Sequence, residues 1–368
     1  MVDRFVPGLE LSRRFYLDCV GPLLADHFRG LAHAAALLGD GSEVLGFDTA
    51  RSADHDWGPR VAIFLRSGDA QRYAEDVVAL LSDCLPKTFL GFATHFVTRG
   101  TGVRHREATD CPISHQVDVT DLDAWFARTL GFDARRRPTT RDWLATPTQL
   151  LAGVTGGAVF HDDLGELTLA RRNLSWYPTD VWRYVLACQW QRVAEREAFV
   201  GRCGEVGDEL GSAVVAAQLV RELMRLCLLQ QRRYPPYDKW LGAEFARSTD
   251  AAALTGTLSD ALTARAWLER EAALAVAYQH VASAQNRLAL APSVDPGTRR
   301  YHDRPFQVLH AERFSAALRA RIVDAGLRQL PLVGSVDQWI DNVTALDATV
   351  QRRAAVESMT AAEPDIPG

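Results

Sequence analysis

Lysine is nearly missing from this sequence: only Lys87 and Lys239 occur among 41 basic residues, and all the others are arginine. Arginine is therefore the ordinary cation of the chain. A lysine that persists against this bias is a candidate for chemistry that suits a compact ammonium group better than a planar guanidinium. The formal net charge of −5 provides no overall basic field for duplex DNA or anionic lipid, so nucleic acid is not a favoured partner.

Long apolar runs, a secretory start and paired cysteines are also missing. The longest uncharged run, 143–160, is interrupted by a proline and three glycines, so it predicts no membrane span. The opening residues lack the basic start and apolar stretch of a signal peptide, and a cytoplasmic location is expected. The six cysteines are far apart without a Cys-x-x-Cys pair, which predicts reduced, mostly buried thiols.

The first part of the chain combines helical and strand-like patterns. Apolar spacing predicts an opening helix over 9–28 and a second helix through 73–81. Short apolar runs predict strands over 32–38, 61–65, 92–97 and 116–119. We therefore expect an α+β domain over 1–172, with a mixed sheet and flanking helices.

The second part of the chain is helical in pattern. Helices are predicted over 181–199, 209–231 and 257–288, with Gly and Pro-Pro punctuation between them. These patterns predict a helical-bundle domain over 173–292 on which the first domain packs. A small helical C-terminal unit over 293–350 and a disordered tail over 351–368 complete the expected organisation.

One pattern of residues indicates chemistry. Gly41-Ser42 is followed by eleven residues and then by Asp54 and Asp56. Two aspartates at i and i+2 on a strand face the same side, about 6–7 Å apart, so their carboxylates can converge on Mg²⁺ or Mn²⁺. A Gly-Ser turn lets backbone N–H groups approach phosphate closely. The pattern predicts a site for a metal-bound nucleoside triphosphate.

This spacing resembles the DNA polymerase beta-like nucleotidyltransferase superfamily, whose motif is Gly-Ser, roughly ten residues, then Asp-x-Asp. The wider chain resembles a bacterial family of unknown function within that superfamily, through Trp57-Gly58-Pro59-Arg60, Val159-Phe160-His161-Asp162, Trp176-Tyr177-Pro178, the segment 207–212, Pro236-Tyr237-Asp238-Lys239-Trp240 and Arg304-Pro305-Phe306. The resemblance implies a magnesium-dependent enzyme that moves a nucleoside monophosphate from a triphosphate, ATP being expected, to a hydroxyl acceptor that the sequence does not identify.

A third carboxylate would complete a two-metal site. Asp118 lies in the apolar-acid-apolar pattern of an inner strand and is the predicted third ligand and catalytic residue beside Asp54 and Asp56. Asp162 and Asp163 are competing sources, because they follow another apolar run.

Two further features concern ligand binding. Lys239, near the start of a predicted helix in the second domain, is expected to contact the triphosphate together with Tyr237, as is common in nucleotidyltransferases with helical second domains. Three His-Asp doublets, at 55–56, 161–162 and 302–303, could indicate a metal phosphohydrolase, but chance accounts for them better. The alternative to an enzyme is a non-catalytic nucleotide-binding regulatory module.

Overall fold

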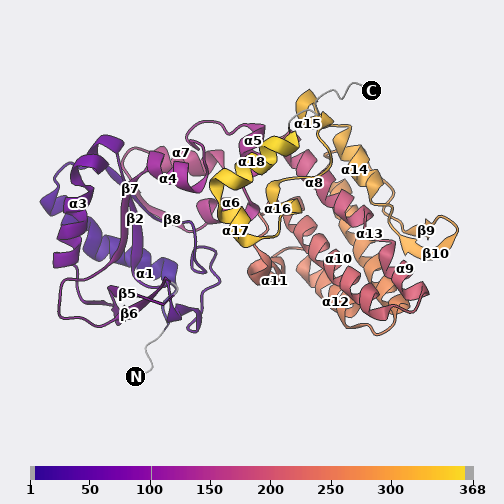
Figure 1. The fold of residues 1–368 in the computed structure, drawn as a ribbon, viewed down its shortest axis with the longest axis horizontal. Helices are drawn as coiled ribbons and strands as arrows, with labels where there is room; N and C mark the ends of the chain where they lie inside the picture. Colours follow the sequence, from indigo (N-terminus) through magenta and orange to yellow (C-terminus); the bar gives the residue numbers. More distant parts are fainter. Residues whose placement is uncertain (1–4, 101, 361–368) are drawn as a thin grey trace. The chain divides into compact units, whose positions relative to one another are not determined.

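A computed structural model describes residues 5–100 and 102–360 and divides them into two compact units (Figure 1). The described part of unit 1 runs through Asp142 and includes Leu150–Ser175. Unit 2 contains Trp143–Gln149 and the described residues from Trp176 onward. The α+β fold class is confirmed, because unit 1 is built on a mixed sheet and unit 2 is mainly helical.

The sheet of unit 1 has the strand order β7-β2-β1-β8. Its strands are β1 (His33–Leu37), β2 (Arg60–Leu65), β7 (Gln116–Asp121) and β8 (Ala158–Asp162). Strand β1 is antiparallel to both β2 and β8, whereas β2 is parallel to β7. The predicted strands at 32–38, 61–65 and 116–119 are confirmed, and the apolar runs that predicted them form the sheet interior.

Helices cover one face of this sheet. The predicted opening helix is confirmed as α1 (Gly8–Phe15), a π-helical turn η1 (Tyr16–Val20) and α2 (Gly21–His27), and the second as α3 (Ser67–Cys84) (Figure 1). Their apolar sides pack on the odd-numbered strand residues in one core cluster that contains Phe15, Val20, Leu24, Ala35, Val61, Ile63, Leu65, Val77, Leu81 and Val117. Burial of these side chains fixes the strand register.

The other face of the sheet carries smaller side chains. Ala36 pairs with Ala62, and Ala62 pairs with Asp118, so these three side chains lie side by side on that face. Helix α4 (Leu122–Thr129) covers part of it, with the ring centroids of Trp125 and Phe64 5.7 Å apart. Two small hairpins, β3 (Thr88–Phe89) with β4 (Phe92–Ala93) and β5 (His95–Arg99) with β6 (Val103–Glu107), and helix α7 (Glu166–Asn173) complete the unit.

Unit 2 is a helical assembly with one hairpin. Its elements include α8 (Thr179–Ala194), α9 (Phe199–Glu205), α10 (Glu209–Gln230), α11 (Asp238–Ala246), α12 (Ala251–Thr263), α13 (Trp267–Arg287), β9 (Arg299–Tyr301), β10 (Arg304–Val308), α14 (Glu312–Arg319), α15 (Ala325–Gln329), α16 (Val336–Trp339), α17 (Val343–Asp347) and α18 (Thr349–Thr360). The chain passes between the units within α5 (Thr140–Ala145), within α6 (Thr148–Thr155) and again between Ser175 and Trp176. Among the residues that the structure describes, no helix has both the length and the apolar character needed to cross a bilayer.

The C-terminal part differs from the sequence-based boundaries. Helix α14 packs on α8, so residues 293–350 belong to unit 2 and do not form a separate body. Residues 349–360, expected to be largely tail, form α18, whose Arg352 and Val356 side chains are buried. Residues 361–368 lie outside the described part of the chain. The predicted helix over 257–288 is also two helices, because the backbone is extended at Ala264 and Ala266 between α12 and α13.

Candidate functional site

The Gly41-Ser42 turn directly follows β1 and is held in place by a buried ion pair. Arg60 donates from Nε to Glu43, 2.6 Å away, and from Nη2 to the backbone carbonyl of Asp40. Glu43 is only 2% exposed. Gly41 has φ of +129°, and a Cβ there would collide with the Arg60 guanidinium. Glycine is therefore required at this position by both the backbone conformation and the close approach of Arg60.

The loop is also tied to neighbouring parts of unit 1. The N–H of Gly39 donates to the carbonyl of Gly153 at 2.9 Å, and the N–H of Gly157 donates to the carbonyl of Val44 at 2.8 Å. A Cβ on Gly153 would lie 2.5 Å from the carbonyl oxygen of Gly39. These contacts fix the Gly41-Ser42 turn against the segment that precedes β8. A fixed backbone of this kind is suited to binding a ligand through its N–H groups.

Asp54 and Asp56 do not lie on a strand, so their predicted i, i+2 strand geometry is wrong. Asp54 ends a short 3₁₀ helix, Ser52–Asp54, and Asp56 has φ of +46°, in the left-handed region. Strand β2 begins only at Arg60, because Pro59 has no N–H for strand pairing and Gly58 has φ of +151°. The two carboxylates therefore project from an irregular loop.

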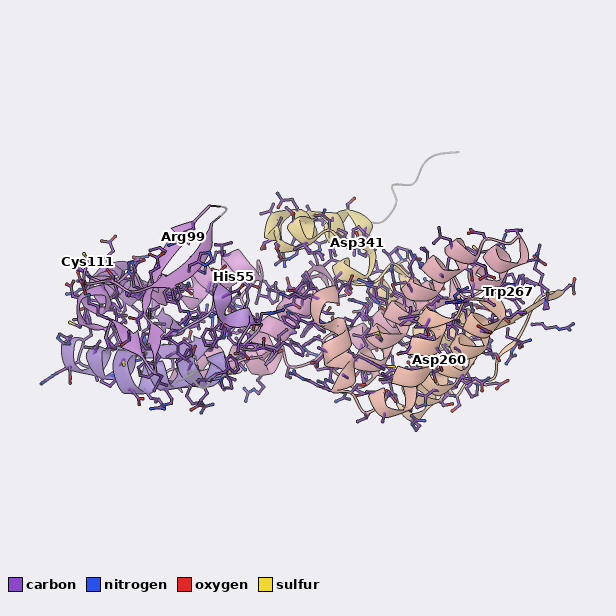
Figure 2. The ribbon with its side chains drawn as sticks, turned by 90° about the horizontal axis from the view of Figure 1, so that it is seen from below. His55, Arg99, Cys111, Asp260, Trp267 and Asp341 are labelled. Carbon is purple, nitrogen blue, oxygen red and sulfur yellow. The ribbon has the colours of Figure 1, made fainter. Side chains whose placement is uncertain are left out.

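Each carboxylate of this loop already has a nitrogen-bearing side chain as its partner. Asp54 accepts from Nδ1 of His55 at 2.7 Å, and both side chains are more than half exposed. Asp56 accepts from Nε of Arg104 at 3.1 Å, and its backbone N–H donates to the carbonyl of Arg104 at 2.9 Å. His55, on this loop, and Arg99, on the β5–β6 hairpin, lie at the surface of the unit (Figure 2). The loop is thus joined to the hairpin that carries Arg104.

Asp118 lies on β7 beside Ala62, but β7 is an edge strand of the sheet, so the predicted inner-strand position is wrong. Its side chain is 60% exposed, and it forms an ion pair with Nη2 of Arg128, on α4, at 3.6 Å. The exposure has a simple cause. Ala36 and Ala62, its neighbours across the sheet, are too small to cover it.

A cavity of about 420 Å³ opens over this small-residue face. It is lined by Asp118 and by three arginines, Arg60, Arg104 and Arg128, together with Ala36, Leu37, Leu38, Val61, Ala62, His115, Gln116, Val117 and Trp125. Asp118 is the predicted site residue that lines the cavity, while Arg60 contacts the loop of Gly41 and Arg104 contacts Asp56. Each of these arginines is paired with a carboxylate, Glu43, Asp56 or Asp118, so an anionic ligand in the cavity would compete with those ion pairs.

The two competing acids have other contacts. Asp162 accepts hydrogen bonds from the N–H and the hydroxyl of Thr168, at 2.8 and 2.7 Å, near the start of α7. Asp163 accepts from the backbone N–H of His33 at 3.0 Å and forms an ion pair with His161. His161 pairs with Ala35 and Asp118 is aligned with Ala36, so these two functional side chains lie on opposite faces of the sheet.

Tyr237 and Lys239 lie in unit 2, whereas the other predicted residues lie in unit 1. Tyr237 precedes α11, and its backbone N–H donates to Oε1 of Gln149 at 3.0 Å. Lys239 is exposed on the first turn of α11, with Nζ 4.9 Å from the ring centroid of Trp240. Their contribution to a triphosphate site stays a prediction.

The carboxylates of unit 1 do not fit a preassembled Mg²⁺ site. Among the residues that the structure describes, the one group of three metal-ligating side chains within 4.8 Å of one another is His33, His161 and Asp163. Asp54, Asp56 and Asp118 are outside it, and they are paired with His55, Arg104 and Arg128 respectively. Asp54, Asp56 and Asp118 therefore do not form a resident two-metal centre.

Several contributing residues escape sequence reasoning. Arg60, Arg104 and Arg128 are three of many arginines, and only the sheet register and the hairpin bring them to one cavity. Glu43 has an acidic side chain beside the motif, but its burial could not be read from local sequence. The thiols differ from expectation too, because Cys84 and Cys111 are exposed and only Cys188 and Cys227 are fully buried.

Comparison with known proteins covers one segment of the chain. Residues 143–241 match a domain of unknown function (DUF4037). The match includes β8, α8 to α10 and the segment with Tyr237 and Lys239, but none of Gly41, Ser42, Asp54, Asp56 and Asp118. No curated protein matches the chain.

Proposed function

We propose that the chain is a nucleotidyltransferase that transfers a nucleoside monophosphate from a magnesium-bound triphosphate, with ATP the expected donor, to a hydroxyl acceptor. The observation that carries this proposal is the cavity over the small-residue face of the sheet, which is lined by Asp118 and three arginines. Its volume of about 420 Å³ is in the range of small-molecule sites. The resemblance to the DNA polymerase beta-like superfamily in the Gly41-Ser42 and Asp54-x-Asp56 spacing supports the same conclusion.

In this proposal the magnesium ion arrives as part of the substrate. The triphosphate oxygens bind Arg60, Arg104 and Arg128 through charge-assisted hydrogen bonds, and the backbone of the Gly41-Ser42 turn approaches a phosphate. An acceptor oxygen then attacks the α-phosphorus in line, the bond to the bridging oxygen breaks, and pyrophosphate leaves. The acceptor's hydroxyl proton passes to Asp118, the carboxylate that lines the cavity.

A second candidate has a specific observation in its favour. Asp54, Asp56 and Asp118 are each paired with His55, Arg104 or Arg128, an arrangement that also suits a module that binds a nucleotide without turnover. Such a module would use the same arginine-lined cavity but would not need the carboxylates.

Binding and turnover together separate these candidates. Purified full-length protein is titrated with Mg·ATP and then incubated with α-labelled ATP and candidate hydroxyl compounds, with pyrophosphate release as the readout. Transfer of label together with pyrophosphate release, both lost in Asp118→Asn, supports the enzyme. Binding that Asp118→Asn leaves unchanged, without release under any condition, favours the regulatory module. Absence of binding of all four common nucleoside triphosphates at millimolar concentration contradicts both.

A further inference from the structure

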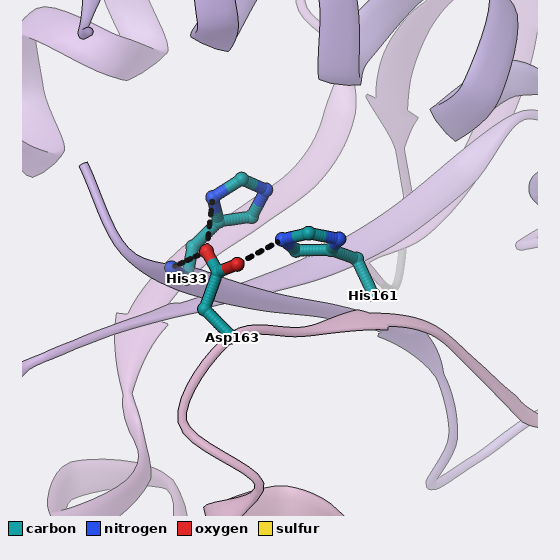
Figure 3. Close-up of side chains that lie close together, drawn as sticks. All are labelled: His33, His161 and Asp163. Atoms are coloured by element: carbon teal, nitrogen blue, oxygen red, sulfur yellow. Dashed lines mark hydrogen bonds and ion pairs between the residues drawn. The ribbon is translucent and has the colours of Figure 1, made fainter. Parts of the chain in front are cut away.

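Two histidines and an aspartate meet at the far end of β1 from the Gly41 loop. His33 is the first residue of β1, His161 is near the end of β8, and Asp163 directly follows β8. Antiparallel pairing of these strands, with Ala35 opposite His161, brings residues 128 or more positions apart in sequence into one cluster (Figure 3). The backbone reinforces the arrangement, because the N–H of Asp163 donates to the carbonyl of His33 at 3.1 Å.

The side chains point at a common centre. Nε2 of His161 is 2.9 Å from Oδ1 of Asp163, and Nδ1 of His33 is 3.8 Å from Oδ2 of the same carboxylate (Figure 3). One ligand atom from each residue can be chosen so that all three lie within 4.8 Å of one another. Two ligands of a tetrahedral zinc ion at about 2.0–2.1 Å are about 3.4 Å apart, so the outermost pair of atoms must approach by up to about 1.4 Å. His161 and Asp163 are each more than a third exposed and free to make this approach.

The remaining contacts of His33 resemble those of a metal-ligating imidazole. Its Nδ1 is 3.1 Å from the carbonyl of Leu31, and its Nε2 is 2.9 Å from the hydroxyl of Tyr16. Whichever nitrogen binds a cation, the other has a neutral partner that fixes the ring's orientation.

The cluster also borders a cavity of about 670 Å³ on the helix-covered side of the sheet. Tyr16, His33, His161, Asp163 and Arg66 line it on the polar side, and residues of η1, α2 and the segment after α2 line the rest. Three protein ligands beside an open cavity leave coordination positions for water or an anionic ligand, as in exchangeable or catalytic metal sites.

We propose that His33, His161 and Asp163 bind one divalent first-row transition metal ion, with its open coordination positions facing this cavity. Two imidazole nitrogens and one carboxylate form a set that suits zinc, iron or cobalt and not magnesium, which takes oxygen ligands. This site does not rest on the proposed nucleotidyl transfer, because its residues lie on the opposite face of the sheet from Asp118. The competing account is a His–Asp cluster held only by its own hydrogen bonds.

The test uses chelator-treated full-length protein in millimolar Mg²⁺, which occupies oxygen-ligand sites. Zn²⁺ is titrated by calorimetry, and Co²⁺ by its visible absorption, which reports nitrogen and oxygen coordination separately from thiolate coordination. We expect one ion per chain and no thiolate-to-cobalt band. His161→Ala and Asp163→Asn should each weaken Zn²⁺ binding at least tenfold.

Two controls keep the result interpretable. Asp163→Asn retains an oxygen to accept from the backbone N–H of His33, so its melting temperature should stay close to that of the parent. His27→Ala removes an exposed histidine of the neighbouring α2 and should leave the affinity unchanged. Absence of Zn²⁺ binding at micromolar concentration overturns the proposal, as does an affinity that His161→Ala does not alter.

Discussion

Gly41→Ala should destabilise unit 1 through the contact between Gly41 and Arg60. Alanine at φ of +129° is strained, which costs roughly 1–3 kcal/mol. The added Cβ would also displace the Arg60 guanidinium from the carboxylate of Glu43, a residue that is 2% exposed. Breaking a buried ion pair by removing one partner costs about 3–5 kcal/mol. Because Arg60 can move aside without being removed, we expect a combined loss of about 3–5 kcal/mol in the free energy of unfolding.

Gly30→Ala is the matched control. Gly30 also has a positive φ, of +77°, but a Cβ there meets nothing within 4 Å. Its loss should be only about 1–2 kcal/mol, the cost of a left-handed conformation. Urea unfolding of both variants measures the difference. If the two variants lose the same free energy, within about 0.5 kcal/mol, the collision with Arg60 contributes nothing and the reasoning fails.

Three other outcomes are expected. Asp118→Asn should abolish nucleotidyl transfer yet leave the melting temperature nearly unchanged, because its ion pair with Arg128 is exposed and such pairs contribute about 0–1 kcal/mol. If the variant loses activity and also melts at a clearly lower temperature, Asp118 has a structural role. Lys239→Ala should weaken triphosphate binding by about 1–3 kcal/mol, with partial recovery in Lys239→Arg, whereas Lys87→Ala should have no effect. If calorimetry gives the parent and Lys239→Ala the same affinity for the triphosphate, Lys239 is not part of the site. Burial raises the pKa of Glu197 to about 7, so its contribution to the stability of unit 2 is full below pH 4.5 and is lost as pH rises through 7. Urea unfolding between pH 4.5 and 7 should therefore show the parent losing up to about 3 kcal/mol of unfolding free energy relative to Glu197→Gln. A difference between the two proteins that does not change with pH would refute this prediction.

The elements of the fold were largely predictable because their burial pattern is local. The apolar runs at 32–38 and 61–65 become β1 and β2, and the heptad-like spacing through 73–81 becomes α3. The same logic fails at 351–360, where burial of Arg352 and Val356 on other helices decides the outcome. Tertiary contacts of this kind leave no periodic signal in the segment itself.

The candidate site was predicted in composition but not in geometry. Gly41 is at a turn that requires glycine, whereas Asp118 was expected on an inner strand and lies on the edge strand β7. Asp54 and Asp56 were expected on a strand, although Gly58-Pro59 already indicated that pairing could not start before Arg60. His33 carried no signal, because its partners 128 and 130 residues later meet it only through strand pairing.

The most direct test of the central claim is a calorimetric titration of Mg·ATP into the parent, Arg104→Ala and Arg99→Ala. Arg104 and Arg99 lie on the same hairpin, each paired with a carboxylate, but only Arg104 lines the cavity beside Asp118. We expect the parent to bind Mg·ATP saturably and Arg99→Ala to bind it with the same affinity. Arg104→Ala should bind it at least tenfold more weakly, because one charge-assisted hydrogen bond contributes about 1.5–3 kcal/mol. Equal affinities in all three proteins, or no binding at millimolar Mg·ATP, would contradict the central claim.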